Sequence, residues 1–369
     1  MSPRRDATRV VHAGLPAAEQ GAPLLPGPTF AAPFHLAGDP ASAEYVYGRY
    51  GNPTWSRYEE AIGELEGGPA VLFASGAAAV TAVLLTVLRP GDVLVAPSDA
   101  YPAVRQIATG HLEPRGVEVR LVPTAGEHLV NTLTGARLLW LETPTNPGLD
   151  VCDVRALVAA AREQDTLVAL DNTLATPLGQ RPLELGADFS VASDTKSMTG
   201  HSDLVLGHVA VAEPERADDL REWRRLTGAL AGPMETWLAH RSLATLELRL
   251  TRQCENALVI AEWLRGRTEV AGVRYPGLPD DPSHAFAARQ MTHFGPVLCF
   301  ALADRVTAER FLTRCELVAE ATSFGGIHTS AERRARWGTD EVPEGFIRLS
   351  AGCEDAADLI ADLDQALGG

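Results

Sequence analysis

The sequence predicts an α/β protein with a mostly parallel sheet, and two observations carry that prediction. From Ala70 onward, short apolar runs alternate with helical stretches, which is typical of a sheet covered by helices on both faces. Near Gly232 the pattern changes to a long helical region, which indicates a second, smaller α/β domain. The seven expected strands are 70–74, 93–96, 117–122, 138–141, 167–170, 189–192 and 205–211.

The chain has 369 residues, too many for one small core, and we divide it into three parts. Residues 1–44 are rich in Pro, Ala and Gly and follow neither a period of 2 nor one of 3.6, so we expect an extended arm that contacts a neighbouring subunit. Residues 45–232 form the large domain and 233–369 the small one. The small domain should contain a helical region at 234–264, strands at 297–302 and 346–350, and a final helix at 354–367.

The composition argues against several classes of protein. A net charge of −16 argues against a nucleic-acid-binding surface. The most apolar stretch, 77–88, is too short to cross a bilayer, and no apolar core of a signal peptide follows Arg4 and Arg5, so we expect a cytoplasmic protein without a membrane partner. Five scattered cysteines without a Cys-x-x-Cys pair give neither a disulfide framework nor a metal site.

Lys196 is the residue on which the functional prediction depends. The other 31 of the 32 basic residues are arginine, and a guanidinium group cannot replace an amine that must lose its proton and attack a carbonyl. A leftover surface lysine is the alternative interpretation. The hydroxyls of Ser193 and Thr195 favour a phosphate held beside the amine, as pyridoxal phosphate requires.

Polar residues follow several of the expected strands, and ligands of parallel sheets bind at the carboxyl ends of strands. Ser75-Gly76 leads from a strand into a helix, where backbone N–H groups can bind an anion, although such a pair is more often only a helix cap. Asn146 lies between Pro144 and Pro147 in a loop where its amide can bind a carboxylate or a cofactor oxygen. A rigid turn explains that loop equally well.

Four further residues have both a chemical and a structural interpretation. Asp171, 25 residues before Lys196, can keep the ring nitrogen of pyridoxal phosphate protonated, or it can cap a helix. Tyr47 and Arg49 can bind phosphate, whereas aromatic loops often only pack. Arg348 lies inside an apolar strand and needs an anion, which is either the carboxylate of an amino acid or an internal Asp or Glu.

Other catalytic signatures find no support in the sequence. His201, Ser202 and Asp203 are too closely spaced to form a Ser/His/Asp triad. The sequence contains no His-Glu-x-x-His, and no expected strand is followed by Gly-x-Gly-x-x-Gly. A metal hydrolase and a nicotinamide-dependent dehydrogenase are therefore disfavoured.

Taken in order, these motifs resemble those of the cystathionine γ-synthase and γ-lyase family, the transsulfuration branch of the fold-type I pyridoxal phosphate enzymes of cysteine and methionine metabolism. The resemblance covers nearly the whole chain. It rests on 8–14, 47–54, Ser75-Gly76, the Asn146 loop, 171–173, 193–203, 275–278, 323–326 and 348–350.

The resemblance implies roles for individual residues. Lys196 would bind pyridoxal phosphate covalently and move protons, Tyr101 would stack on the ring and assist proton transfer, and Asp171 would pair with the ring nitrogen. The amino-acid substrate would be bound by Asn146, Ser323 and Arg348. The other cofactor ligands would be Ser75, Gly76, Ala77, Thr173, Ser193 and Thr195 of one subunit, and Tyr47 and Arg49 of its neighbour in a homotetramer built as a pair of dimers.

Several positions depart from the family pattern. Thr322 replaces the glutamate that commonly precedes the Ser-Leu-Gly-Gly motif, and Ser197 replaces the tyrosine often found after the lysine. Pro102 replaces a glycine, Ala77 replaces a methionine, and Ala103 stands where methionine γ-lyases have a cysteine. Because these positions border the expected entrance for the substrate, they bear on the choice of substrate rather than on the family.

We therefore expect an enzyme that performs γ-elimination in the manner of a cystathionine γ-lyase, converting cystathionine to cysteine, 2-oxobutanoate and ammonia. The alternatives are γ-replacement on an activated homoserine and a specialised reaction on a natural-product amino acid. A non-catalytic binding protein with the same fold is more remote, because Lys196, Asp171, Arg49 and Arg348 are all retained.

Overall fold

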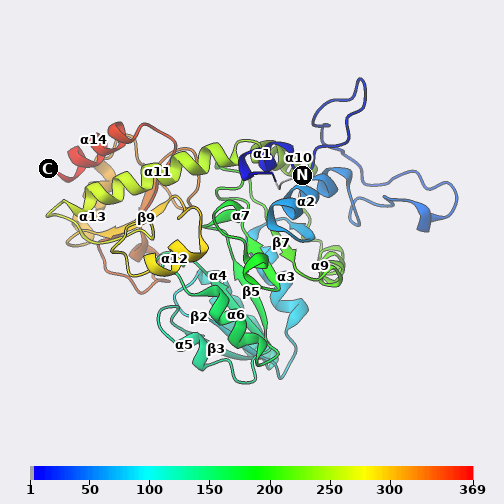
Figure 1. Ribbon diagram of the computed structural model, residues 1–369, viewed down its shortest axis with the longest axis horizontal. Coiled ribbons are helices and arrows are strands. Elements are labelled where there is room, and N and C mark those ends of the chain that lie inside the picture. The colour runs from blue at the N-terminus through cyan, green and yellow to red at the C-terminus, as the bar shows by residue number, and fades with distance from the viewer. Residues whose placement is uncertain (1–3, 369) are drawn as a thin grey trace.

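A computed structural model describes residues 4–368, in which two α/β units lie beside each other (Figure 1). Residues 1–3 of the predicted arm and Gly369 of the predicted small domain lie outside the described residues. Within residues 4–368, no helix is both long and apolar enough to cross a membrane.

The larger unit is built on a sheet that, within the described residues, has seven strands in the order β1-β7-β6-β5-β4-β2-β3. Strand β7 runs antiparallel to both of its neighbours, and the other pairs are parallel. The prediction of a mostly parallel sheet is therefore confirmed. The strands are β1 (Ala70–Phe73), β2 (Val93–Pro97), β3 (Glu118–Val122), β4 (Leu138–Glu142), β5 (Leu167–Asp171), β6 (Phe189–Ala192) and β7 (Gly207–Val211).

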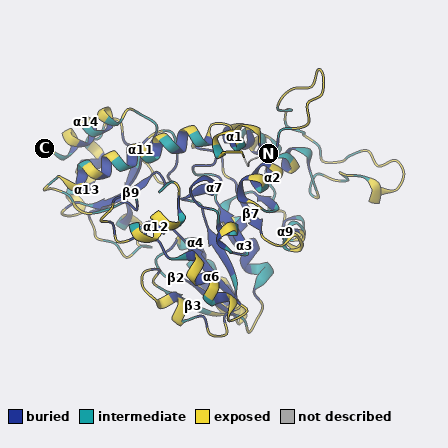
Figure 2. Ribbon diagram, in the orientation of Figure 1, coloured by how far each residue is buried: buried dark blue, intermediate teal, exposed yellow. Residues whose placement is uncertain are grey.

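Both faces of this sheet are covered, because successive side chains of a strand point to opposite faces. In β4, Trp140 packs in the cluster that contains α3, whereas Leu139 and Leu141 pack in the cluster that contains α6. Figure 2 shows the inner strands as buried and the helices as exposed on their outer sides, whereas the edge strand β3 is only partly buried. The helices of this unit are α2 (Pro53–Glu66), α3 (Gly76–Val87), α4 (Pro102–Ile107), α5 (His128–Asn131), α6 (Val154–Arg162), α7 (Thr176–Gly179), α8 (Pro182–Leu185) and α9 (Pro214–Thr227).

The smaller unit has a second sheet, which in the described part of the chain contains five strands in the order β10-β11-β12-β9-β8. The predicted strands at 297–302 and 346–350 and the final helix are present as β9, β12 and α14. Strands β8, β10 and β11 were not predicted. The elements are β8 (Ala271–Arg274), β9 (Val297–Ala301), β10 (Ala319–Glu320), β11 (Ser330–Arg333), β12 (Phe346–Ser350), α12 (His284–Gln290), α13 (Arg305–Arg314) and α14 (Ala356–Leu367).

The long helical region predicted at 234–264 consists of two helices, α10 (Pro233–Leu243) and α11 (Leu246–Arg265). The buried Arg249 side chain donates to the carbonyl of Ser242 at 3.0 Å and to Thr245 Oγ1 at 3.2 Å, at the junction of the two helices. Helix α10 packs on α2 of the larger unit, whereas α11 continues to the second sheet. Because the continuous helix α11 joins the two units (Figure 1), the structure does not mark one residue as the boundary between them. The predicted boundary at 232/233 therefore stays a prediction.

The N-terminal segment has two parts. Helix α1 (Asp6–His12), which the sequence did not predict, packs on α2 and α11 and buries Val10. Residues 15–51 form an irregular segment, much of which projects from the body (Figure 1), although the carbonyl of Pro26 accepts from Trp237 of α10 at 2.9 Å. Leu24 and Phe30 of this segment are 87% and 72% exposed. A monomer seldom extends so much apolar surface into water, so this projecting arm (residues 15–51) resembles a segment that a partner covers.

The sheet meets helix α3 through a close approach of two glycines. A Cβ atom added to Gly207 would lie 2.6 Å from the N and Cα of Gly76 and from the carbonyl oxygen of Ser75. Backbone cannot move away as a flexible side chain can, so this contact requires glycine and fixes the start of α3 against β7.

We expect Gly207→Ala to lower the free energy of unfolding by about 1–3 kcal/mol, the usual cost of overpacking a well-packed site. Chemical denaturation measures the change. Gly110→Ala is the matched control, because an added Cβ there meets nothing within 4 Å. Equal changes in the two variants would contradict the close-approach argument.

Candidate active site

A cavity of about 290 Å³ lies at the carboxyl ends of the large sheet, where segment 322–324 of the smaller unit closes it. Lys196, Asp171 and Arg348, singled out by residue type and position, all line this cavity. Strand β5 supplies Asp171, the loop after β6 supplies Lys196, and β12 supplies Arg348. The two units therefore build one site.

The side chain of Lys196 lines this cavity and is half-buried. Its Nζ donates to Ser323 Oγ at 2.6 Å and lies 5.2 Å from the centre of the Phe324 ring. Burial, followed by the positive charge of Arg348, lowers the pKa of Lys196 to about 8, although Glu332 acts in the opposite direction. The amine is therefore partly uncharged near neutral pH, in the form that can attack a carbonyl.

Segment 322–326 lies directly on the lysine turn, by which we mean residues 193–200. A Cβ atom on Gly325 would come within 2.5 Å of the backbone N of Ser197. Ser323 has φ of 85°, in the left-handed region that non-glycine residues rarely occupy. This backbone conformation accompanies the short contact between the Ser323 hydroxyl and the Lys196 amine.

Asp171 ends β5 and is buried at the inner wall of the cavity. Its Oδ1 accepts a hydrogen bond from the Thr173 N–H at 3.0 Å. Burial raises the pKa of Asp171, while the Thr173 hydrogen bonds and the charge of His208 oppose that rise. A buried carboxyl held in this way is suited to pair with a protonated ring nitrogen.

Glu142 also lines the cavity, although the sequence analysis gave it no role. Its two carboxyl oxygens accept from the N–H of Tyr101 at 2.8 Å and from the N–H of Asn146 at 2.7 Å. Burial and the nearby Asp171 raise the pKa of Glu142 well above its ordinary value. Glu142 thus fixes the two loops that carry Tyr101 and Asn146. Glu142, like Asp171, ends an apolar strand, and this position in the sequence could have identified it as a site residue.

Tyr101 lies at the mouth of the cavity, with 43% of its surface exposed. Burial, Asp171 and Glu142 raise the pKa of its phenol, so the phenol is protonated at neutral pH. The exposed ring of Tyr101 is available to stack on a flat ligand, and its protonated phenol can donate a hydrogen bond.

The start of α3 forms an anion cradle opposite the lysine turn. Ser75 caps the helix by accepting from the Ala78 N–H at 3.1 Å, and a Cβ atom on Gly76 would lie 2.6 Å from Ser193 Cβ. Gly76, Ala77, Thr173 and Ser193 line the cavity here. Backbone N–H groups at a helix N-terminus bind phosphate readily, so this cradle, Asp171 and Lys196 together fit pyridoxal phosphate.

The hydroxyl of Thr195 has main-chain partners in this structure. It donates to the carbonyl of Leu206 and accepts from the N–H of Leu206, both at 3.1 Å. Its predicted role as a phosphate ligand stays a prediction, as does that of Ser75, whose hydroxyl caps α3.

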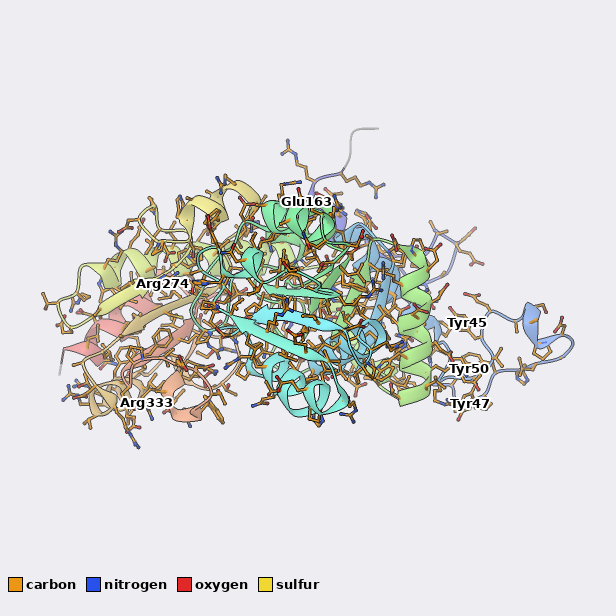
Figure 3. The ribbon with its side chains drawn as sticks, turned by 90° about the horizontal axis from the view of Figure 1, so that it is seen from below. Tyr45, Tyr47, Tyr50, Glu163, Arg274 and Arg333 are labelled. Carbon is orange, nitrogen blue, oxygen red and sulfur yellow. The ribbon has the colours of Figure 1, made fainter. Side chains whose placement is uncertain are left out.

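Tyr47 and Arg49 lie on the projecting arm, outside the residues that line the cavity. Arg49 donates to the carbonyl of Arg225 at 3.0 Å and lies 5.1 Å from the centre of the Tyr50 ring. Figure 3 shows Tyr47 and Tyr50 at the opposite end of the molecule from Arg333 of the smaller unit. Within one chain, these two predicted phosphate ligands are thus separate from the site.

Arg348 has an internal acidic partner, which was the alternative to a substrate carboxylate as its anion. Strands β11 and β12 place Glu332 directly opposite Arg348, and the two side chains form an ion pair. Arg348 also donates to Asn146 Oδ1 at 2.6 Å and to the carbonyl of Ser323 at 3.0 Å. Arg348 therefore contacts both of the other predicted substrate ligands, Asn146 and Ser323.

Glu332 and Arg334 belong to the site but were not predicted from the sequence. Arg334 lines the cavity and donates to Glu332 at 2.8 Å and to Asp340 at 2.6 Å. Thr322, which replaces the common glutamate, donates to Glu332 at 3.3 Å. In the sequence these residues belong to an ordinary charged run, and only the strand register places them in the site.

The lowered pKa of Lys196 predicts its reactivity. We expect an amine-acylating reagent to label the Lys196 peptide of the cofactor-free protein at a rate that is half-maximal near pH 8, because only the uncharged amine reacts. Mass spectrometry separates this peptide from the N-terminal one. In the unfolded chain the midpoint should move to about 10.4, the ordinary value for lysine. A midpoint near 10.4 in the folded protein would contradict the burial of the amine.

Comparisons with known proteins show relatives of this chain over nearly its whole length. A family model described as "Cys/Met metabolism PLP-dependent enzyme" matches residues 7–368. The chain is 58% identical over 367 residues to a Streptomyces coelicolor protein whose name gives cystathionine gamma-lyase as a provisional activity, covering 98% of this chain and 93% of that protein.

Solved structures extend the similarity to the fold. A cystathionine gamma lyase from Micromonospora echinospora has a TM-score of 0.93 and 36% identity and is covered completely, as is this chain. A cystathionine gamma synthase from Xanthomonas oryzae pv. oryzae in complex with cystathionine has a TM-score of 0.95 and 33% identity, over 100% of this chain and 98% of that one. The predictions of fold type I and of pyridoxal phosphate as cofactor are confirmed. The chain belongs to the Cys/Met metabolism family of pyridoxal phosphate-dependent enzymes.

Proposed function

We propose that this enzyme performs γ-elimination on cystathionine, which with water gives cysteine, 2-oxobutanoate and ammonia. The observation that carries the proposal is the half-buried amine of Lys196, which lines one cavity together with Asp171 and Arg348 and has a lowered pKa. Similarity to relatives that are named cystathionine gamma-lyases supports the choice of reaction.

Pyridoxal phosphate, when bound, supplies an electron sink that stabilises negative charge at the Cα atom of an amino acid. We assign to Lys196 the covalent attachment of the cofactor and the removal of the Cα proton. Loss of a proton from Cβ then lets the γ-sulfur leave as the thiol of cysteine. The lowered pKa of Lys196 serves both directions of proton transfer, because an amine with a pKa of about 8 both takes and returns protons near neutral pH.

The other roles follow from position. Asp171 would hold the ring nitrogen, and Tyr101 at the mouth would stack on the ring. We assign the phosphate to the α3 cradle and to the hydroxyls around it. These ligands are Ser75, Gly76, Ala77, Thr173, Ser193 and Thr195.

A charge count supports Arg348 as the carboxylate anchor despite its internal partner. Arg105, Arg334 and Arg348 are joined by ion pairs to the carboxylates of Glu332 and Asp340. These five side chains carry three positive and two negative formal charges, so one positive charge is left for a ligand. An α-carboxylate that shares Arg348 with Glu332 would neutralise it.

γ-Replacement on an activated homoserine is the second candidate. The similarity of the fold to that of a cystathionine gamma synthase in complex with cystathionine favours it. Thr322 lines the cavity, and its neutral side chain is compatible with either reaction and with a more specialised amino acid.

An assay of both reactions separates these candidates. We expect the purified enzyme to release 2-oxobutanoate from cystathionine faster than it forms cystathionine from an O-acyl homoserine and cysteine. Coupled reduction of the oxoacid follows the first reaction, and chromatography follows the second. No oxoacid from cystathionine, together with cystathionine from the acyl homoserine, would reverse the order of the two candidates.

We further propose that the enzyme is a cytoplasmic homotetramer built as a pair of dimers. The five cysteines, all unpaired, support a reducing compartment. The projecting arm supports a shared site, because Tyr47 and Arg49 do not line the cavity of their own chain. In a dimer they would reach the phosphate of the neighbouring subunit.

Subunit mixing tests the shared site. Neither Lys196→Ala nor Arg49→Ala alone should be active, but co-expression should restore about a quarter of the parent activity, since half of the dimers are mixed and each holds one intact site. Lys196→Ala mixed with Asp171→Ala is the control, because both residues belong to the site of one chain and no intact site can form. Absence of recovery in the first mixture would overturn the shared site.

A further inference from the structure

A cluster of four buried polar residues lies beneath the lysine turn and outside the residues that line the cavity. Tyr58 and Glu66 come from α2, Asp194 comes from the lysine turn, and His208 comes from β7. All four side chains are at most 1% exposed. Nothing in the proposed reaction uses them, so their burial needs a separate explanation.

Hydrogen bonds join the four side chains in a row. His208 Nδ1 lies 2.6 Å from one oxygen of Asp194, and His208 Nε2 lies 3.2 Å from Glu66 Oε1. The Tyr58 hydroxyl donates to the other oxygen of Asp194 at 3.0 Å. The imidazole therefore bridges two carboxylates that come from different elements.

The geometry calls for a charged imidazole, since both of its nitrogens face carboxylate oxygens. Burial alone lowers the pKa of His208, but Asp194 and Glu66 outweigh it and raise the pKa to about 10. Two carboxylates and one imidazolium give the cluster one formal negative charge in excess, and among residues 4–368 the Oε2 atom of Glu66 has no hydrogen-bond partner. Removing the imidazolium would leave two buried carboxylates uncompensated.

Asp194 connects this cluster to Lys196. It precedes Lys196 by two residues, and its carbonyl accepts from the Thr199 N–H at 3.0 Å, which closes the turn. On the other side, Arg249 donates to the carbonyls of Ser197 at 2.7 Å and Met198 at 3.2 Å. The lysine turn is thus held on both sides by buried cations.

We propose that His208 is a positioning residue for Lys196: it holds Asp194, and through Asp194 it holds the main chain that presents the Lys196 amine to the cofactor. This inference rests on the proposed role of Lys196. The charged groups that face His208 are Asp194 and Glu66, which it contacts, and Asp171, on which its charge acts across the sheet. The same imidazolium therefore favours the ionised form of Asp171, the partner assigned to the ring nitrogen.

The variant that tests the proposal is His208→Leu, which removes the cation but keeps an apolar side chain in the strand. Arg224→Leu is the matched control. Arg224 is also a buried cation that pairs with a residue of α2, since it donates to Glu59 Oε1 at 2.5 Å and to the carbonyl of Leu72 at 2.7 Å. Both variants break a buried ion pair, but only His208 is tied to the lysine turn.

Two measurements on the folded proteins report position rather than stability. The pH midpoint for labelling of Lys196 in the cofactor-free protein reports the burial of its amine, and fluorescence titration with pyridoxal phosphate gives a Kd. We expect His208→Leu to move the midpoint upward from about 8 and to weaken the Kd at least about tenfold, whereas Arg224→Leu changes the Kd by less than about twofold. Thermal unfolding should show similar losses of stability in both variants.

Tyr58→Phe keeps the test available if His208→Leu does not fold. It removes one hydrogen bond to Asp194 and leaves every charge in place. We therefore expect a smaller effect in the same direction: an upward move of the labelling midpoint and a Kd that is weakened about threefold. An unchanged midpoint and Kd in a folded His208→Leu or Tyr58→Phe protein would overturn the proposal. Failure of the proposed role of Lys196 would be seen separately, as a Lys196→Ala protein that binds pyridoxal phosphate as tightly as the parent.

Discussion

The site depends on the partial burial of a single amine that has no carboxylate against it. Within residues 4–368, Lys196 forms no ion pair, and its hydrogen-bond partner is the hydroxyl of Ser323. Burial and the Arg348 guanidinium both favour the uncharged amine, which is the form that can bond to the aldehyde of pyridoxal phosphate. A carboxylate beside the amine would keep it charged and unreactive near neutral pH.

The structure around the amine holds several carboxylates nearby but pairs each of them with other groups. Glu332 is held by Arg348 and Arg334, Glu142 accepts from two backbone N–H groups, and Asp194 is held by His208. Each buried carboxylate has its own donors and does not need the lysine. This arrangement lets one cavity contain an uncharged amine, a ring partner and a carboxylate anchor without collapse into a lysine–carboxylate pair.

The sequence predicted those parts of the site that a rare residue type in an apolar context reveals. The sole lysine, an Asp at the end of one strand and an Arg inside another led to Lys196, Asp171 and Arg348, which the structure brings to one cavity. Glu332 could not be predicted, because its meaning comes from the register between β11 and β12. Its neighbours in the sequence are charged and look like a solvated face. The internal partner of Arg348 was therefore an open alternative until the pairing was known.

The strands of the large sheet were predicted from short apolar runs in the sequence, since a strand buried on both faces needs only a continuous apolar segment. The break between α10 and α11 was not predicted from the sequence. It accompanies hydrogen bonds from Arg249 to the helix junction and to the lysine turn, and such long-range contacts leave no trace in the apolar periodicity. His208 inside an apolar strand was as strong a signal as Arg348, but its partner Asp194 lies within the lysine motif, where the sequence indicated no separate role for it.

Borohydride reduction of the protein loaded with pyridoxal phosphate tests the central claim most directly. Because the sequence contains one lysine, the account predicts a reduced pyridoxyl group on Lys196 alone, located by peptide mass spectrometry, and its loss in Lys196→Ala. A pyridoxyl label that persists in Lys196→Ala on any group other than the α-amino group would contradict it.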